Sequence, residues 1–123
     1  MTMNQETIKK IASFICGSTD DSIPAYRNTR EMVSFFSQFG IRYAYNPLED
    51  LPQKYSFKVQ NVANVLQDHK DKINDIVIYL AESRIYMDCN DYAIALRQLN
   101  QILATEGSRI QLVRSKPQLA QAS

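Results

Sequence analysis

Basic residues interleaved with tyrosines are the clearest chemical signal in this chain. Tyr26 and Tyr55 each lie beside basic residues where an apolar helical pattern begins, and a further basic group follows the last such pattern. Cations can hold a phosphate backbone while aromatic rings stack on bases, and the free N–H groups at a helix start also favour phosphate. The candidate nucleic-acid contacts are therefore Arg27, Arg30, Lys54, Lys58, Arg109, Arg114 and Lys116. The same residues also fit an ordinary charged surface.

Residues that could catalyse a reaction are sparse. His69 is the single histidine, and the two cysteines, Cys16 and Cys89, lie far apart in the sequence. A zinc site needs several such ligands at close spacing, and a nucleophilic cysteine needs a base and a group that orients it. Neighbouring acids occur only in polar segments typical of solvated loops. The sequence therefore predicts that the protein is not an enzyme and that it has no cofactor and no metal site. It also predicts that the thiols are buried and structural.

Apolar stripes at helical spacing predict the elements that must position the basic residues. The expected helices span residues 5–16, 24–39, 55–67, 72–83 and 91–105. Pro24 suits a first helical turn, and Asp91 or Asn90 is the candidate N-cap of the last helix. Each of the three glycines follows a stripe, where a left-handed residue commonly closes a helix. The aromatic stripe around Phe35 fits a hydrophobic core better than a partner-binding groove.

The last stretch changes from helical to alternating spacing. Ile110 and Leu112 alternate, which predicts a strand over 109–114. Ser115 and Lys116 are the expected turn, and 117–119 is the expected edge strand because a proline fits an edge. Residues 41–54 indicate an ordered loop in which a short strand would fit. The predicted fold is mainly α, a compact bundle of about five helices with a small C-terminal β-hairpin or strand.

The composition fits one domain of 123 residues, with an ordered core over about 5–119. Hydrophobic residues make up 45% of the chain, and the net charge of +1 argues neither for nor against nucleic acid. No apolar run approaches the roughly 20 residues that cross a bilayer. The polar amino terminus has no apolar region of a signal peptide, so we expect a cytoplasmic protein without a membrane partner.

Several short segments together resemble a known family. They are Ile11–Gly17, Tyr26-Arg27, Phe35–Gly40, Leu80–Tyr86, Leu99–Gly107 and Pro117-Gln118-Leu119. This pattern resembles the amino-terminal domain, third type, of AbiJ-like abortive-infection proteins. The resemblance implies a bacterial anti-phage context and a non-catalytic domain placed before an effector, often a HEPN-type ribonuclease. The ribonuclease signature, an Arg and a His separated by four residues, does not occur at His69.

The residues and the resemblance lead to one functional expectation and two alternatives. The expected role is a non-enzymatic sensor or regulatory module that recognises nucleic acid or a phage-derived partner. The contact residues are expected to form one surface, with the starts of the second and third helices beside the basic tail. The first alternative is a helical adaptor that oligomerises or recruits an effector. The second is a small nuclease, which the lack of a shared motif disfavours.

Overall fold

Helices and a terminal hairpin make up the part of the chain that the computed structural model describes, residues 3–18 and 23–121. The helices are α1 (Gln5–Cys16), α2 (Thr29–Ser37), α3 (Tyr55–Asp68), α4 (Ile73–Leu80) and α5 (Cys89–Ala104). The strands are β1 (Ser108–Val113) and β2 (Lys116–Gln121). Short 3₁₀ turns occur at Pro47–Asp50, Pro52–Lys54, Lys70–Lys72 and Ser83–Ile85. The predicted fold class is therefore confirmed.

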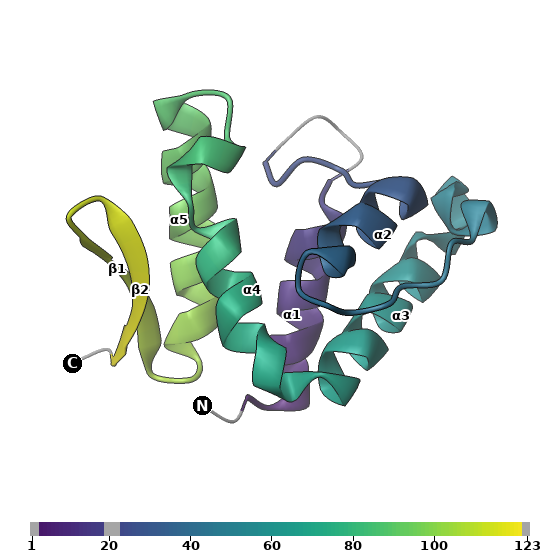
Figure 1. Cartoon of the computed structure of the whole chain (residues 1–123), viewed down its shortest axis with the longest axis horizontal. Helices are drawn as coiled ribbons and strands as arrows, with labels where there is room; N and C mark the ends of the chain where they lie inside the picture. The colour runs from purple at the N-terminus through teal and green to yellow at the C-terminus, as the bar shows by residue number, and fades with distance from the viewer. Residues whose placement is uncertain (1–2, 19–22, 122–123) are drawn as a thin grey trace.

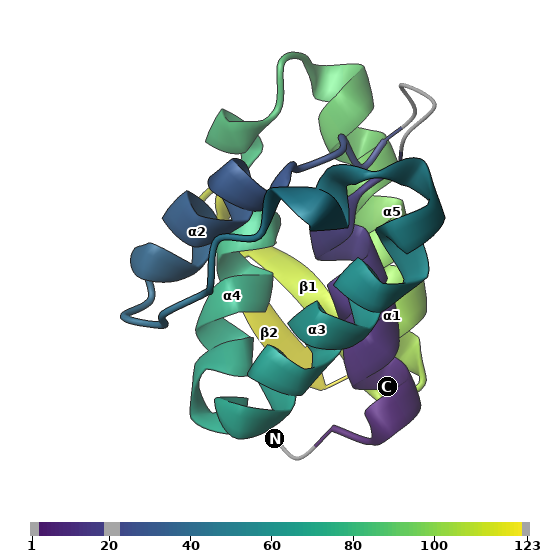
Figure 2. The same cartoon turned by 90° about the vertical axis from the view of Figure 1, so that its right-hand side faces the viewer.

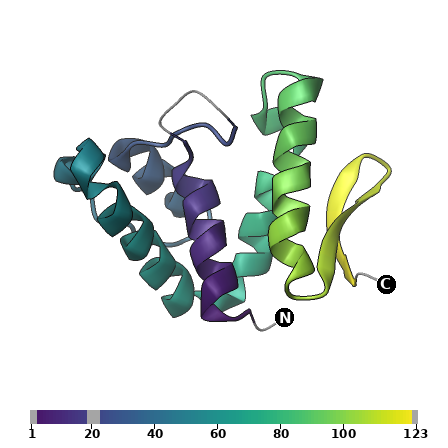
Figure 3. The ribbon, with the colours of Figure 1, turned by 180° about the vertical axis from the view of Figure 1, so that it is seen from behind.

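The elements follow one another along the long axis of the molecule (Figure 1). α1, α2 and α3 lie towards one end, α4 and α5 follow, and the hairpin lies at the other end, as the view from behind also shows (Figure 3). Viewed along that axis, the strands cross behind α4 towards α5 (Figure 2). The hairpin thus covers α4 and α5, which separate it from α2 and α3.

The predicted stripes form one hydrophobic core. Phe36 is fully buried, and its ring meets that of Phe35 edge to face with centroids 5.2 Å apart. Full burial of such a side chain contributes about 1.5–3 kcal/mol. The aromatic stripe of α2 is therefore core. The other stripe residues in this core are Ile8, Ile11, Ala12, Ile15, Met32, Val59, Val62, Ala63, Leu66, Ile73, Ile76, Val77, Leu80, Leu99 and Leu103.

The second helix begins at Thr29, so the predicted start at Pro24 is wrong. Asn28 caps α2, because its side chain accepts from the Glu31 N–H (2.8 Å) and Glu31 accepts from the Asn28 N–H (3.0 Å). This reciprocal capping box satisfies two N–H groups that the helix leaves free. At the other end, α2 ends at Ser37 with Gln38 as its C-cap, so the predicted end at Phe39 is wrong by two residues, and Gly40 follows in the turn with a φ of 73°.

We expect Asn28→Ala to lower the free energy of unfolding by about 1 kcal/mol, since it removes the cap. Urea denaturation followed by circular dichroism measures this loss. Asn74→Ala is the matched control, because Asn74 is an exposed residue of α4 and alanine favours a helix. An equal loss in both variants would contradict the capping role of Asn28.

The fourth helix ends at Leu80, before the predicted end at Ser83. Two tyrosine hydroxyls bind the backbone oxygens at this end: Tyr86 Oη donates to Leu80 O (2.5 Å) and Tyr92 Oη donates to Ala81 O (2.8 Å). These bonds satisfy carbonyl groups that a helix end leaves free. The chain therefore turns away from α4 before Ser83.

The fifth helix begins at Cys89, and neither predicted N-cap is the cap. Asp88 caps α5, since its carboxylate accepts from the Asp91 N–H (2.8 Å). Asn90 and Asp91 therefore lie in the first helical turn. The prediction was wrong by two or three residues because Asp88, Asn90 and Asp91 all have side chains that suit a cap.

The hairpin turn lies at Arg114 and Ser115, one residue before the predicted turn. Both residues have positive φ, 53° and 66°, and Val113 pairs with Lys116 across the turn. A two-residue turn with positive φ at both positions matches the twist of the strands and favours Asn-Gly. An arginine and a serine occupy these positions instead.

The segment 41–54 is a loop, as predicted, with two 3₁₀ turns in its second half, and the short strand that would have fitted there does not form among these described residues. Ile41 and Tyr43 alternate because both are buried. The Tyr43 ring stacks on Phe36 (5.4 Å between centroids), and its hydroxyl donates to Glu49 (2.9 Å). The alternation thus reflects burial of the loop without strand pairing.

Candidate nucleic-acid interface

The structure does not gather the seven predicted contact residues on one surface. Arg109, Arg114 and Lys116 lie on the hairpin, whereas the other four lie at the starts of α2 and α3. α4 and α5 stand between these two groups (Figures 1 and 3). The expected juxtaposition of the helix starts with the basic tail is therefore wrong. The three candidate residues of the hairpin, Arg109, Arg114 and Lys116, are all exposed.

Lys58 is a core residue, so its predicted role as a contact is wrong. Its side chain is 0% exposed, and its ammonium donates to Arg27 O and to Tyr26 Oη (3.0 Å). It also forms an ion pair with Asp50 (3.3 Å). A buried cation requires such partners because its desolvation is unfavourable. Every donor of the ammonium group is thus directed at the protein itself.

Asp50 completes this buried group. Its Oδ1 accepts from the Thr29 N–H (2.8 Å) and from the Thr29 hydroxyl (3.1 Å), as well as from Tyr26 (3.1 Å). Desolvation opposes ionisation of Asp50, but the hydrogen bonds from Thr29, Lys58 and Tyr26 outweigh it and lower the pKa of the carboxyl. The group ties α2, α3 and the first 3₁₀ turn together.

Arg27 is also held mainly by the protein. Its guanidinium donates to Ile15 O (2.9 Å) and lies 4.9 Å from the centroid of the Phe35 ring. Desolvation lowers the pKa of Arg27. One side of Arg27 still lines a groove of about 520 Å³ together with Arg30, Phe35 and Tyr79. Arg30 is exposed and is the freer cation of this pair.

Lys54 lies at the opposite end from the hairpin, at the start of α3. Its ammonium lies 5.1 Å from the centroid of the Phe57 ring, a cation–π contact. Phe57 is 61% exposed and Leu48 is 63% exposed, and both line one hollow with Lys54. This end of the molecule combines one cation with an apolar surface, which a protein partner fits better than a phosphate backbone does.

The hairpin has one face against the helices and one face in solvent. Ile110 is 6% exposed on the inner side, and its N–H donates to Asn100 Oδ1 of α5 (2.7 Å). Alternation then directs the neighbouring side chains away from the helices. We call this surface the outer face, and in paired order it consists of Arg109 and Ala120, Gln111 and Gln118, and Val113 and Lys116.

The outer face contains two cations, two amides and no acid. Arg109 and Lys116 lie at its diagonal corners, and Gln111 and Gln118 form the central pair. Arg114 adds a third cation at the turn. The face has no aromatic side chain. It therefore combines positive charge with hydrogen-bonding groups.

Arg84 is a basic residue that sequence reasoning missed. It lies in the 3₁₀ turn Ser83–Ile85, where its guanidinium pairs with Glu82 and lies 5.8 Å from the Tyr79 ring centroid. Arg84 and Lys116 line one hollow of about 440 Å³ between this turn and the hairpin. No spacing in the sequence signals this proximity, because it depends on how the hairpin folds back over α4.

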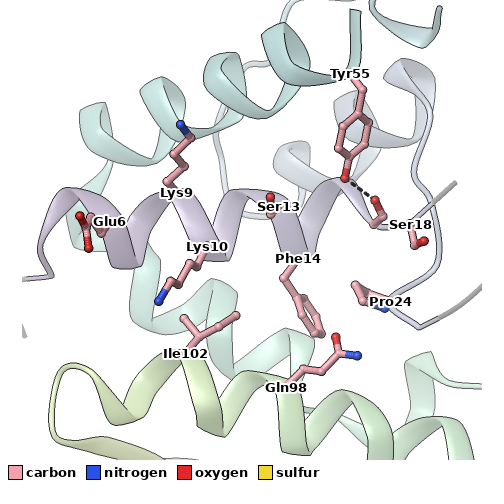
Figure 4. Close-up of a pocket in the computed structure, with 11 residues that line it drawn as sticks. Glu6, Lys9, Lys10, Ser13, Phe14, Ser18, Pro24, Tyr55, Gln98 and Ile102 are labelled. Atoms are coloured by element: carbon pink, nitrogen blue, oxygen red, sulfur yellow. Dashed lines mark hydrogen bonds between the residues drawn. The ribbon is translucent and has the colours of Figure 1, made fainter. Parts of the chain in front are cut away.

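A groove of about 660 Å³ runs between α1 and α5 (Figure 4). Phe14 and Ile102 supply apolar surface, and Lys9 and Lys10 extend from α1. Two polar side chains at its walls already have partners, since Gln98 donates to Ile23 O (2.8 Å) and Tyr55 donates to Gly17 O (2.5 Å). The groove therefore offers chiefly apolar contact.

Comparison with family models, with curated proteins and with solved structures finds no match to this chain. The resemblance to AbiJ-like proteins thus stays a prediction. Within 3–18 and 23–121, no group of three or more His, Cys, Asp or Glu side chains could hold a metal ion. In the same residues, no helix has both the length and the apolar composition to cross a membrane.

The two cysteines are free and differ in environment. Cys16 is buried, and desolvation raises its thiol pKa to about 12, whereas Cys89 is exposed at the start of α5. The prediction of a buried thiol is thus confirmed for Cys16 and wrong for Cys89.

We expect Ellman's reagent at pH 8 to modify one thiol per native chain and two in denaturant. Rapid reaction of both native thiols would contradict the burial of Cys16, and Cys89→Ser identifies the reactive one.

Proposed function

We propose that this chain is a non-enzymatic sensor or regulatory module of a cytoplasmic bacterial anti-phage protein that recognises nucleic acid through its hairpin. The observation that carries the proposal is the outer face, where Arg109 and Lys116 flank a pair of glutamines without any acid. Cations that hold phosphates and amides that bond to base edges are the two kinds of contact nucleic-acid binding needs. Because the net charge of +1 by itself favours no class of partner, the proposal depends on this local arrangement of charge.

The turn supports the same proposal. Arg114 occupies a left-handed position, which is unfavourable for residues other than Gly, Asn or Asp. A local conflict of this kind is expected at functional sites. Arg114 lies at the tip between the strands and is exposed, so its charge adds to that of the outer face. The Arg84 and Lys116 hollow lies on the side next to α4.

The triple variant Arg109→Ala, Arg114→Ala and Lys116→Ala tests the proposal. We expect its affinity for a labelled mixed-sequence DNA to fall by about tenfold or more at low salt. The slope of the logarithm of the binding constant against the logarithm of the salt concentration should become less steep by about 0.9 for each phosphate contact that is lost. Fluorescence anisotropy at several salt concentrations measures both quantities.

The matched control removes the same charge elsewhere. Lys9, Lys10 and Lys70 are exposed residues distant in sequence from the hairpin, so their triple alanine variant should bind nearly as the native chain does. Equal losses in the two variants would show a diffuse charge effect, and no loss in the hairpin variant would remove the proposed interface.

The anti-phage setting rests on the resemblance described above. It implies an effector, such as a HEPN-type ribonuclease, that this module regulates. We expect bacteria that express the native gene to lose protection against phage when the hairpin carries the triple variant, while the lysine control keeps it. Efficiency of plating measures the difference. Full protection by the hairpin variant would separate defence from nucleic-acid binding.

A helical adaptor is the second candidate function, and the apolar end of the molecule favours it. Leu48, Leu51 and Phe57 are 63%, 41% and 61% exposed around the start of α3. Such a surface can self-associate or bind an effector. Size-exclusion chromatography with light scattering distinguishes the two candidates. An oligomer that Phe57→Ser dissociates into monomers favours the adaptor if the native chain also shows no salt-sensitive binding of nucleic acid.

A further inference from the structure

We infer that the outer face binds double-stranded DNA in its major groove. The inference rests on the proposed function and narrows it to one kind of nucleic acid. The hairpin is a two-stranded ribbon whose paired side chains project to one side. A major groove about 12 Å wide admits such a ribbon, because neighbouring strands lie only about 4.8 Å apart.

The arrangement of side chains fits a duplex. Arg109 and Lys116 lie at opposite corners of the outer face, four residue steps apart along the strands, or about 13 Å. Phosphates border the major groove on both sides, so corner cations can reach them while the central Gln111 and Gln118 meet base edges. A glutamine amide can form two hydrogen bonds with adenine in this groove.

The absence of aromatic side chains on the outer face argues against a single strand. Sequence-tolerant binding of single strands uses rings on which successive bases stack. The exposed aromatic side chains Tyr45 and Phe57 belong to the loop after α2 and to α3, outside the hairpin. The outer face therefore cannot replace the stacking that bases lose when a strand is bound alone.

The geometry also favours B-form DNA over an RNA duplex. The major groove of A-form RNA is deep and narrow, and side chains do not read it. The ribbon is held on its inner side by the buried Ile110 and by the hydrogen bond from its N–H to Asn100 (2.7 Å). A ribbon anchored in this way enters a wide groove without rearrangement.

The first experiment compares three labelled probes with the full chain by fluorescence anisotropy. They are a 20-base-pair mixed-sequence DNA duplex, one of its strands alone, and an RNA duplex of the same sequence. We expect the DNA duplex to bind about tenfold or more tightly than either alternative. Tighter binding of the single strand or of the RNA duplex would overturn the inference and leave the proposed function standing.

The second experiment identifies the groove by competition. Methyl green occupies the major groove of DNA and netropsin the minor groove. We expect methyl green to displace the chain from the DNA duplex and netropsin to have no effect. Displacement by netropsin alone would overturn the inference.

Two variants connect the result to the outer face. Gln111→Ala with Gln118→Ala should reduce duplex affinity by about threefold to tenfold while the slope against salt stays unchanged, since no phosphate contact is lost. Arg114→Asn with Ser115→Gly keeps the turn and removes only the cation at the tip. The slope of the logarithm of the binding constant against the logarithm of the salt concentration should therefore become less steep by about 0.9. If both variants bind the DNA duplex with the affinity and the salt slope of the native chain, the inference is overturned. If the native chain binds none of the probes, the proposed function is overturned as well.

Discussion

Lys58→Met is expected to destabilise the protein by about 3 kcal/mol. The methionine fills similar space but removes the donor that Asp50, Tyr26 Oη and Arg27 O share. Breaking a buried ion pair from one side typically costs about 3–5 kcal/mol. Asp50 keeps some access to water, with a side chain 33% exposed, so the lower end of that range applies.

Urea denaturation at neutral pH measures the effect of Lys58→Met. Lys54→Met is the matched control, because Lys54 is four residues away and exposed, and it should change stability by less than about 0.5 kcal/mol. The Lys58→Met and Asp50→Asn double variant should cost less than the sum of the two single changes, since both act on one group. A loss below about 1 kcal/mol for Lys58→Met would show that the ammonium is not a structural element.

Gly17→Ala is expected to be at least as damaging, with a loss of about 3 kcal/mol or more. Gly17 has a φ of 80°, and a Cβ there would lie 2.0 Å from Ala25 O and 2.7 Å from Tyr26 Cα. All of the nearest atoms belong to the backbone. The Cβ would therefore push apart two segments joined by the Arg27 N–H to Cys16 O bond (2.9 Å). The backbone conformation of Gly17, with φ 80° and ψ −177°, is essentially restricted to glycine and itself adds about 1–3 kcal/mol for alanine.

Gly40→Ala and Gly107→Ala separate these two causes. Both glycines have positive φ, 73° and 67°, but no atom lies within 4 Å of a Cβ at either position. Their variants should lose only about 1–2 kcal/mol from backbone conformation. The extra loss at Gly17 over these two variants then measures mainly the steric contribution of the close approach. Equal losses at all three positions would contradict the close approach of Gly17 to Ala25.

The helices could be predicted from sequence because their stripes have the helical period. The α1 bounds and the α3 start agree with the prediction, whereas the α2 start does not. Asn28 and Glu31, three residues apart, have the residue types of a capping box, but Pro24 also suits the start of a helix and lies earlier in the chain. The tyrosine bonds that end α4 could not be predicted, since Tyr92 reaches Ala81 only after α5 has folded back.

The candidate site was predicted in part, for a physical reason that differs between residues. Alternation around Ile110 is local, so the exposed cations Arg109, Arg114 and Lys116 follow from the sequence. The burial of Lys58 is not local, because its partners come from two other segments of the chain. The pairing of Gln111 with Gln118 needed the register, because a turn one residue earlier than predicted changes the partner of Gln111 by two residues, from Ala120 to Gln118.

The two-sidedness of the hairpin has an evolutionary consequence. Ile110 and its neighbours on the inner side attach the strands to the helical body, so mutations there are constrained by folding. The opposite side chains are almost free of that constraint, and surface changes usually alter stability by less than about 0.5 kcal/mol. Descendants of this gene can therefore exchange residues at positions such as 111 and 118 while the scaffold stays the same.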